Sequence, residues 1–188
     1  LVGEDGVTHH GVFDMAAFGA VPGLIFAAPL DEAELRKLMY TALHAGHPFM
    51  IRYPRGAGEG AAWRGEPFET VPVGRGRRLR DGEEVALLTI GTVGNAAARA
   101  AEAAAAQGVG VAHYDLRFVK PLDEELLEEV GRRFRRVVTV EDGVLRGGVG
   151  EAVTAFFNSR GYAVSVQRLG IGDEWVEHGT PSQLHALC

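Results

Sequence analysis

Residues 24–53, with the sequence LIFAAPLDEAELRKLMYTALHAGHPFMIRY, decide the class of fold. Leu24–Ala28 is a short apolar run, which is typical of a buried parallel strand. Asp31, with Glu34 three positions later, has the pattern that starts many helices, and Phe49–Tyr53 reads as the next strand. A strand, a helix and a strand within this short distance predict a right-handed βαβ unit.

The second half of the chain repeats this alternation after a connection without periodicity. Residues 58–78 are rich in glycine and proline, which is typical of a linker. Beyond them, apolar runs alternate with helical patterns, and we therefore expect a mostly parallel α/β sheet covered by helices. The expected strands of this sheet are residues 85–90, 109–115, 136–140 and 162–169.

Composition argues against several classes of function. The chain has 188 residues, of which 46% are hydrophobic, enough for one good core or two smaller ones. Its net charge of -6 argues against nucleic acid or an anionic membrane as the main partner, since both attract basic surfaces. No apolar stretch approaches the roughly 20 residues of a membrane span. The single cysteine, Cys188, cannot form an internal disulfide, which favours a reducing cytoplasm.

Two loops carry the candidate site residues. Gly3–Asp14 reads GEDGVTHHGVFD and places a carboxylate, a hydroxyl and two imidazoles close together. Arg52–Gly56 reads RYPRG and sets two guanidinium groups beside a rigid turn. An acid, an imidazole and a guanidinium on neighbouring loops are suited to bind a small phosphorylated substrate that carries hydroxyl groups.

Each candidate residue also has a plainer interpretation. Asp5 precedes a glycine and is also a turn former, while a lone histidine such as His9 is usually an ordinary surface residue. Arg55 by itself would be a solvated charge, but its neighbouring proline and glycine favour a phosphate contact through the planar guanidinium. Arg52 lies within the predicted strand, and we expect it to support the loop through an ion pair or a carbonyl group.

Both loops resemble those of one enzyme family, which reads D-G-x-T-H-x-G-x-F-D in the first and R-Y-P-R-G in the second. Further similar segments are Phe118–Asp123, Glu141–Gly150 and Leu169–Gly179. Over its whole length the chain thus resembles the 1-deoxy-D-xylulose-5-phosphate synthase family, thiamine-diphosphate enzymes of the transketolase group. The family pattern leaves the position of His10 variable, and we therefore expect His10 to be a bystander.

The resemblance covers only the C-terminal part of that enzyme. The family's diphosphate and metal motif, Gly-Asp-Gly followed by an asparagine, has no counterpart here, and neither does the glutamate that activates the cofactor. The chain also begins at Leu1 rather than at a methionine. We therefore expect a fragment that is inactive alone and holds no metal ligands, with thiamine diphosphate and Mg²⁺ bound mainly by residues upstream of Leu1.

The resemblance also implies an organisation in three segments. Residues 1–57 would be the second half of a pyrimidine-binding domain, residues 58–78 a linker, and residues 79–188 a transketolase-type C-terminal domain. Within the last segment, the glycine-rich stretches 91–95 and 147–150 lack both the G-x-G-x-x-G spacing and the lysine of a P-loop. We expect both to be tight turns from a strand into a helix.

The reaction that the resemblance implies joins pyruvate to D-glyceraldehyde 3-phosphate with loss of carbon dioxide. Its product, 1-deoxy-D-xylulose 5-phosphate, serves isoprenoid, thiamine and pyridoxal biosynthesis. His9 would donate a proton or bind the oxygens of the intermediate, Asp5 would hold a substrate hydroxyl, and Arg55 would hold the phosphate of the acceptor. The family also implies a cytoplasmic homodimer. Three alternatives stay open: transketolase itself, a 2-oxoacid dehydrogenase β-type subunit, and a non-catalytic assembly or regulatory module.

Overall fold

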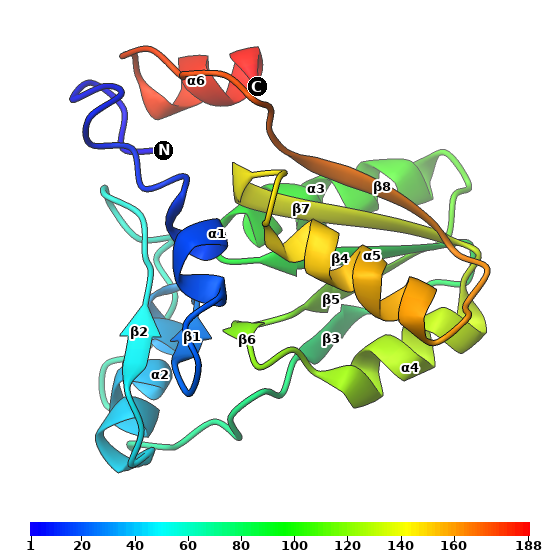
Figure 1. Ribbon diagram of the computed structural model, residues 1–188, viewed down its shortest axis with the longest axis horizontal. Helices are drawn as coiled ribbons and strands as arrows, with labels where there is room; N and C mark the ends of the chain where they lie inside the picture. The colour runs from blue at the N-terminus through cyan, green and yellow to red at the C-terminus, as the bar shows by residue number, and fades with distance from the viewer.

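Two sheets organise the computed structural model, which describes residues 1–188 (Figure 1). In the smaller sheet, β1 (Ile25–Ala27) pairs in parallel with β2 (Phe49–Ile51), and α2 (Glu32–His44) connects the two strands. This arrangement confirms the predicted strand, helix and strand. The Asp31 carboxylate accepts a hydrogen bond of 2.7 Å from the Glu34 amide, so Asp31 caps the helix as its sequence pattern predicts.

The larger sheet has the strand order β3-β5-β4-β7-β8. Its strands pair in parallel except for β3, which runs antiparallel to β5 at one edge. The prediction of a mostly parallel sheet in an α/β fold is therefore confirmed. The strands are β3 (Arg77–Arg80), β4 (Val85–Ile90), β5 (Val111–Asp115), β7 (Arg136–Val144) and β8 (Ser165–Ile171).

Helices cover both faces of the larger sheet (Figure 1). On one face, α3 (Val93–Ala106) packs its alanine side over β4 and β5. On the other face, α4 (Glu124–Arg133) and α5 (Val149–Ser159) enclose the main hydrophobic core. None of the helices combines the length and the apolar character that crossing a bilayer would require.

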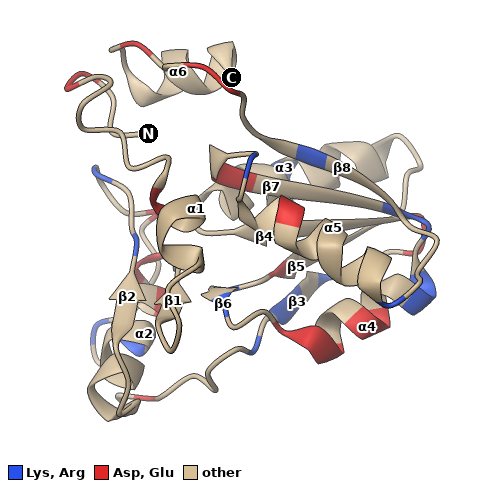
Figure 2. Ribbon diagram, viewed as in Figure 1, with Lys and Arg blue, Asp and Glu red and all other residues tan.

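The structure contains four short elements that the sequence does not predict. They are α1 (Asp14–Gly19), β3, β6 (Phe118–Lys120) and α6 (Pro181–Leu187). The edge strand β3 is rich in arginine and lies beside the acidic helix α4, with Arg78 3.6 Å from Glu129 (Figure 2). Charged residues are common on edge strands because they discourage pairing with other chains, but they hide the apolar alternation on which strand prediction depends.

The strand β6 joins the two halves of the chain. Although it lies between β5 and α4 in sequence, it pairs antiparallel with β1 and completes the smaller sheet. Residues 58–76 cross between the halves without regular structure. Near the start of this path, the Glu32 carboxylate accepts hydrogen bonds of 3.0 and 2.7 Å from the amides of Glu59 and Gly60. The two halves therefore share a sheet as well as a covalent connection.

A buried cluster of charges lies at this junction. Glu34 of α2 is almost fully buried, and its carboxylate is 3.0 Å from the Arg77 guanidinium and 2.8 Å from that of Arg117. Arg77 also lies 3.2 Å from Asp115, whose other oxygen accepts a 3.0 Å hydrogen bond from the Arg117 amide. Breaking such a cluster leaves an uncompensated buried charge, and the cluster therefore holds α2 against the end of β5.

The buried carboxyl group of Asp115 predicts a pH effect on stability. Burial raises the pKa of Asp115 to about 6, although the nearby arginines oppose the shift. Between roughly pH 4 and pH 6 the folded state therefore holds a proton that the unfolded state has lost, and the contribution of this group to stability falls as pH rises through that window. The loss amounts to at most about 3 kcal/mol.

Urea unfolding of the chain and of its Asp115→Asn variant, at a series of pH values, measures this contribution. We expect the free energy of unfolding of the wild type, relative to that of the variant, to decrease from pH 4 to pH 6. A difference that stayed constant or increased over this range would contradict the raised pKa.

Candidate active site

The first candidate loop folds as two consecutive turns. The Gly6 amide donates to the Gly3 carbonyl at 3.1 Å, and the Gly6 carbonyl accepts bonds of 3.0 and 3.2 Å from the amides of His9 and His10. Gly3 and Gly6 have φ angles of 98° and 71°, which residues with a side chain rarely adopt. The turn between these glycines carries Asp5, and the next turn carries His9.

Asp5 and Arg55 form an ion pair, so the structure brings together two of the three predicted site residues. Arg55 follows Pro54 just beyond the end of β2, where parallel sheets commonly gather ligands. The Arg55 side chain is 65% exposed and that of Asp5 is 37% exposed. An exposed pair of this kind contributes little to stability, and a phosphate could replace the carboxylate as the partner of Arg55.

His9 lies on the surface, and no hydrogen bond or ion pair joins its side chain to Asp5 or Arg55. Its Nδ1 atom is 3.0 Å from the Thr8 hydroxyl, which orients the ring. The Nε2 atom makes no hydrogen bond within the chain. The imidazole is thus held at one nitrogen and can exchange a proton with a bound molecule at the other.

Arg52 connects the loop to both halves of the chain. It lies immediately after β2 rather than within the strand, and its guanidinium is largely buried. Nε donates to the Asp14 carboxylate at 2.8 Å, while a terminal nitrogen donates to the carbonyls of Gly11 and Asp142 at 3.4 and 3.0 Å. The expected supporting role, through an ion pair and carbonyl groups, is confirmed.

His10 differs from the sequence-based expectation of a bystander. Only 8% of this residue is exposed, and both of its ring nitrogens form hydrogen bonds. Nδ1 accepts a 3.1 Å bond from the Val2 amide, and Nε2 lies 3.2 Å from the Glu177 carbonyl. Only the distant partner at Glu177 reveals this role, and no local sequence signal points to it.

Glu141, near the end of β7, is another buried acid, and no sequence pattern singled it out. Its carboxylate accepts hydrogen bonds of 2.8 Å from each of the amides of Val149 and Gly150, at the start of α5. Burial raises the pKa of Glu141, and the two amides oppose the shift because they favour the charged form. The glycine-rich stretch 147–150 is the turn from β7 into α5, as predicted, and its Val149 and Gly150 amides already donate to Glu141.

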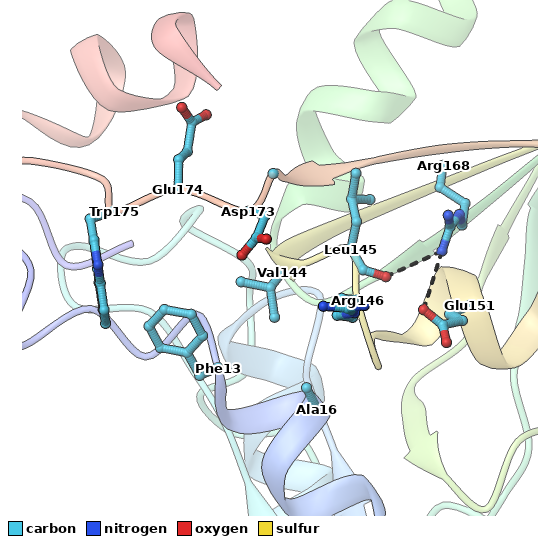
Figure 3. Close-up of a pocket in the computed structure, with 11 residues that line it drawn as sticks. Phe13, Ala16, Val144, Leu145, Arg146, Glu151, Arg168, Asp173, Glu174 and Trp175 are labelled. Atoms are coloured by element: carbon cyan, nitrogen blue, oxygen red, sulfur yellow. Dashed lines mark hydrogen bonds and ion pairs between the residues drawn. The ribbon is translucent and has the colours of Figure 1, made fainter.

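Two cavities are lined by both Arg55 and Asp142. One, of about 80 Å³, is also lined by Arg52, and the other, of about 730 Å³, is also lined by Glu141. A groove of about 690 Å³ lies between α1 and the segment after β8, where the rings of Phe13 and Trp175 meet edge to face at 5.4 Å (Figure 3). The groove combines aromatic surface with charged side chains and was not predicted from the sequence.

No group of three or more His, Cys, Asp and Glu side chains is placed to hold a metal ion. What this chain offers is an exposed imidazole, a carboxylate paired with a guanidinium, and a buried framework beneath them.

The contacts of Arg52 predict a measurable effect on stability. Arg52→Lys keeps the positive charge but cannot reproduce hydrogen bonds to three separate groups. We expect the free energy of unfolding to fall by about 1.5–3 kcal/mol, the usual range for hydrogen bonds to charged groups, measured by urea denaturation. Arg99→Lys is the matched control, because Arg99 is exposed on α3 and forms no ion pair. Equal stabilities of the two variants would contradict the assigned contacts.

The two halves of the chain match two different protein families. Residues 1–59 match the family described as "Transketolase, pyrimidine binding domain", and residues 74–188 match "Transketolase, C-terminal domain". The chain is 55% identical to the 1-deoxy-D-xylulose-5-phosphate synthase of Bacteroides fragilis and 54% identical to that of Bacteroides thetaiotaomicron. Each alignment covers 100% of this chain and 29% of the relative, so the chain spans less than a third of these proteins.

Two solved structures share the fold. A split-gene transketolase, described as an inactive beta4 tetramer, superposes with a TM-score of 0.83 at 29% identity, over 96% of this chain and 57% of that one. A transketolase from Campylobacter jejuni superposes with a TM-score of 0.70 at 19% identity, over 98% of this chain and 27% of that one. The second likeness concerns the fold alone.

Proposed function

The chain belongs to the transketolase family, and we propose that it is the C-terminal portion of a 1-deoxy-D-xylulose-5-phosphate synthase. The complete enzyme would join pyruvate to D-glyceraldehyde 3-phosphate, with loss of carbon dioxide, and so supply isoprenoid, thiamine and pyridoxal biosynthesis. The observation that carries this proposal is the identity of 44–55% to synthases across essentially the whole chain. The intact D-G-x-T-H-x-G-x-F-D and R-Y-P-R-G loops support it.

The same observation weighs against the alternatives. The similar transketolases are only 19–29% identical, well below the synthases. The similar split-gene transketolase is described as an inactive beta4 tetramer, which supports the proposal that this chain is inactive without the rest of the enzyme. We propose the division into residues 1–57, a linker at 58–78 and a C-terminal domain at 79–188. The two family matches, which end at residue 59 and begin at residue 74, support two domains with a connection between them.

We propose that Arg55 binds the phosphate of the acceptor and that Asp5 binds a substrate hydroxyl. The ion pair between these residues places the guanidinium beside the carboxylate on the surface. A phosphate can accept two parallel hydrogen bonds from the guanidinium, and Asp5 would then be released to accept one from a hydroxyl. The contact between the two residues therefore fits a substrate that carries both groups.

His9 would act on the oxygen of the aldehyde. That oxygen gains negative charge when the new carbon-carbon bond forms, and it needs a proton before the product can leave. An exposed imidazole with one free nitrogen is a suitable donor. The chain places this donor on the same short loop as Asp5, which would bind the same substrate.

The cofactor and the assembly belong to the complete protein. We propose that residues outside this chain hold thiamine diphosphate together with Mg²⁺; when bound, the cofactor would supply an electron sink for the decarboxylation of pyruvate. We also propose a cytoplasmic homodimer, as the family resemblance implies.

The function is tested with the full-length protein supplied with thiamine diphosphate and Mg²⁺. We expect 1-deoxy-D-xylulose 5-phosphate to form from pyruvate and D-glyceraldehyde 3-phosphate, detected by mass spectrometry. Transfer of a two-carbon unit from a ketose phosphate, without consumption of pyruvate, would instead identify a transketolase. Absence of both reactions would favour the non-catalytic module.

The assignment of Arg55 predicts a selective kinetic effect. In the full-length enzyme, Arg55→Ala should raise the Michaelis constant for glyceraldehyde 3-phosphate and leave that for pyruvate nearly unchanged, because pyruvate has no phosphate. Loss of the contact should cost about 1.5–3 kcal/mol, or roughly 10- to 150-fold. Arg55→Lys should restore only part of the affinity, since an ammonium cannot form the paired contact. Equal effects on both substrates would refute the assignment.

The assignment of His9 predicts that two steps can be separated. His9→Ala should still release carbon dioxide from pyruvate alone but should form the product about 10²–10⁴-fold more slowly, the usual effect of removing a general acid. Rapid-quench measurements of carbon dioxide and of product, with and without the aldehyde, distinguish the steps. Loss of carbon dioxide release with normal use of the aldehyde would show that the role is wrong.

A further inference from the structure

The loop that carries Asp5 and His9 rests on the C-terminal end of the chain (Figure 1). A side chain in place of Gly3 would lie 3.0 Å from Pro181, and one in place of Gly6 would lie 3.3 Å from His178. The two segments also bury a common apolar cluster. Its members are Leu1, Val12, Ile171, Val176 and Leu184.

Within this contact, His10 is the side chain that bridges the two segments with both of its ring nitrogens. The Val2 amide can only donate, so the Nδ1 atom of His10 accepts and carries no proton. The proton of the neutral ring is then on Nε2, which donates to the Glu177 carbonyl. The ring therefore joins the start of the loop to a backbone group 167 positions away in the sequence.

The backbone of His10 extends this restraint to the site residues. Its amide and that of His9 donate to the same Gly6 carbonyl, which closes the second turn of the loop. A shift of the His10 ring would move this turn, and with it the imidazole of His9 and the preceding turn that bears Asp5. Apolar contacts alone are non-directional and would not fix this orientation.

We propose that His10 is a positioning residue, which clamps the Asp5 and His9 loop to the Glu177 carbonyl and so makes the C-terminal segment 176–181 part of the site. Its kinetic consequence rests on the function proposed above, whereas the clamp itself does not. His10 touches no substrate and acts only through the neighbouring residues of the loop.

Three substitutions in the full-length enzyme test the clamp. His10→Ala removes both hydrogen bonds. His10→Asn offers an amide at the place of Nδ1, and His10→Gln offers one at the place of Nε2, so each can retain one of the two bonds. His47→Ala is the matched control, because His47 is an exposed histidine in the loop between α2 and β2.

Two readouts separate positioning from general stability. Hydrogen exchange should rise in the peptide covering residues 1–12 of His10→Ala and stay unchanged in β4 and β7. In the same variant, kcat/KM for the aldehyde should fall by about 10- to 100-fold, the scale expected for a misplaced catalytic group, while carbon dioxide release from pyruvate alone is preserved. The Asn and Gln variants should lie between His10→Ala and the wild type in both measurements, and His47→Ala should match the wild type.

Each other outcome overturns a defined part of the proposal. Unchanged exchange in residues 1–12 would disprove the clamp, and increased exchange with normal kcat/KM would disprove its role in the site. If His10→Ala does not fold, wild-type behaviour of both the Asn and Gln variants would overturn the proposal in the same way. A wild-type enzyme that made no product would contradict the proposed function, and the exchange measurements would still decide whether the clamp exists.

Discussion

The hydrogen bonds of the Arg52 guanidinium are the interaction on which the candidate site depends. One planar group joins the Asp14 carboxylate and the Gly11 carbonyl of the first loop to the Asp142 carbonyl near the end of β7. Arg52 itself follows β2, so a strand of the smaller sheet, the site loop and a strand of the larger sheet meet at a single side chain. A guanidinium suits this position because its donors point in fixed directions and it keeps its charge at all relevant pH values.

Burial divides the polar residues around the loop into two groups. Asp5, His9 and Arg55 are exposed, with few or easily exchanged partners, as groups that meet a ligand must be. Arg52, His10 and Glu141 are buried or nearly so, and their hydrogen bonds are satisfied by backbone groups or by a fixed carboxylate. Buried hydrogen bonds hold geometry well because breaking them leaves unpaired polar groups out of water. The buried residues thereby orient the exposed ones.

The junction between the two sheets follows the same principle. β6 pairs with β1, and the charges of Glu34, Arg77, Asp115 and Arg117 neutralise one another beside it. Replacing one member would leave its partner charged and buried, whereas the apolar contacts nearby could adapt. The smaller sheet, whose strand β2 leads to Arg55, is therefore fixed relative to the larger sheet, whose strand β7 contains Asp142.

The sequence by itself determined the α/β class, the strand, helix and strand at residues 24–53, the cap at Asp31 and the supporting role of Arg52. These depend on periodicity and on neighbouring residues, which a linear pattern contains. It also singled out Asp5, His9 and Arg55, through two loop motifs. Only the tertiary structure decided that β6 completes the smaller sheet, that His10 is bound to Glu177, and that Glu141 holds the start of α5. Two of these, the pairing of β6 and the bond of His10, join residues far apart in sequence. Glu141 is only eight residues from Val149, but whether its carboxylate turns inward depends on how β7 and α5 pack. Such contacts leave no local signal, because their energy comes from burial and pairing that exist only once the chain has folded.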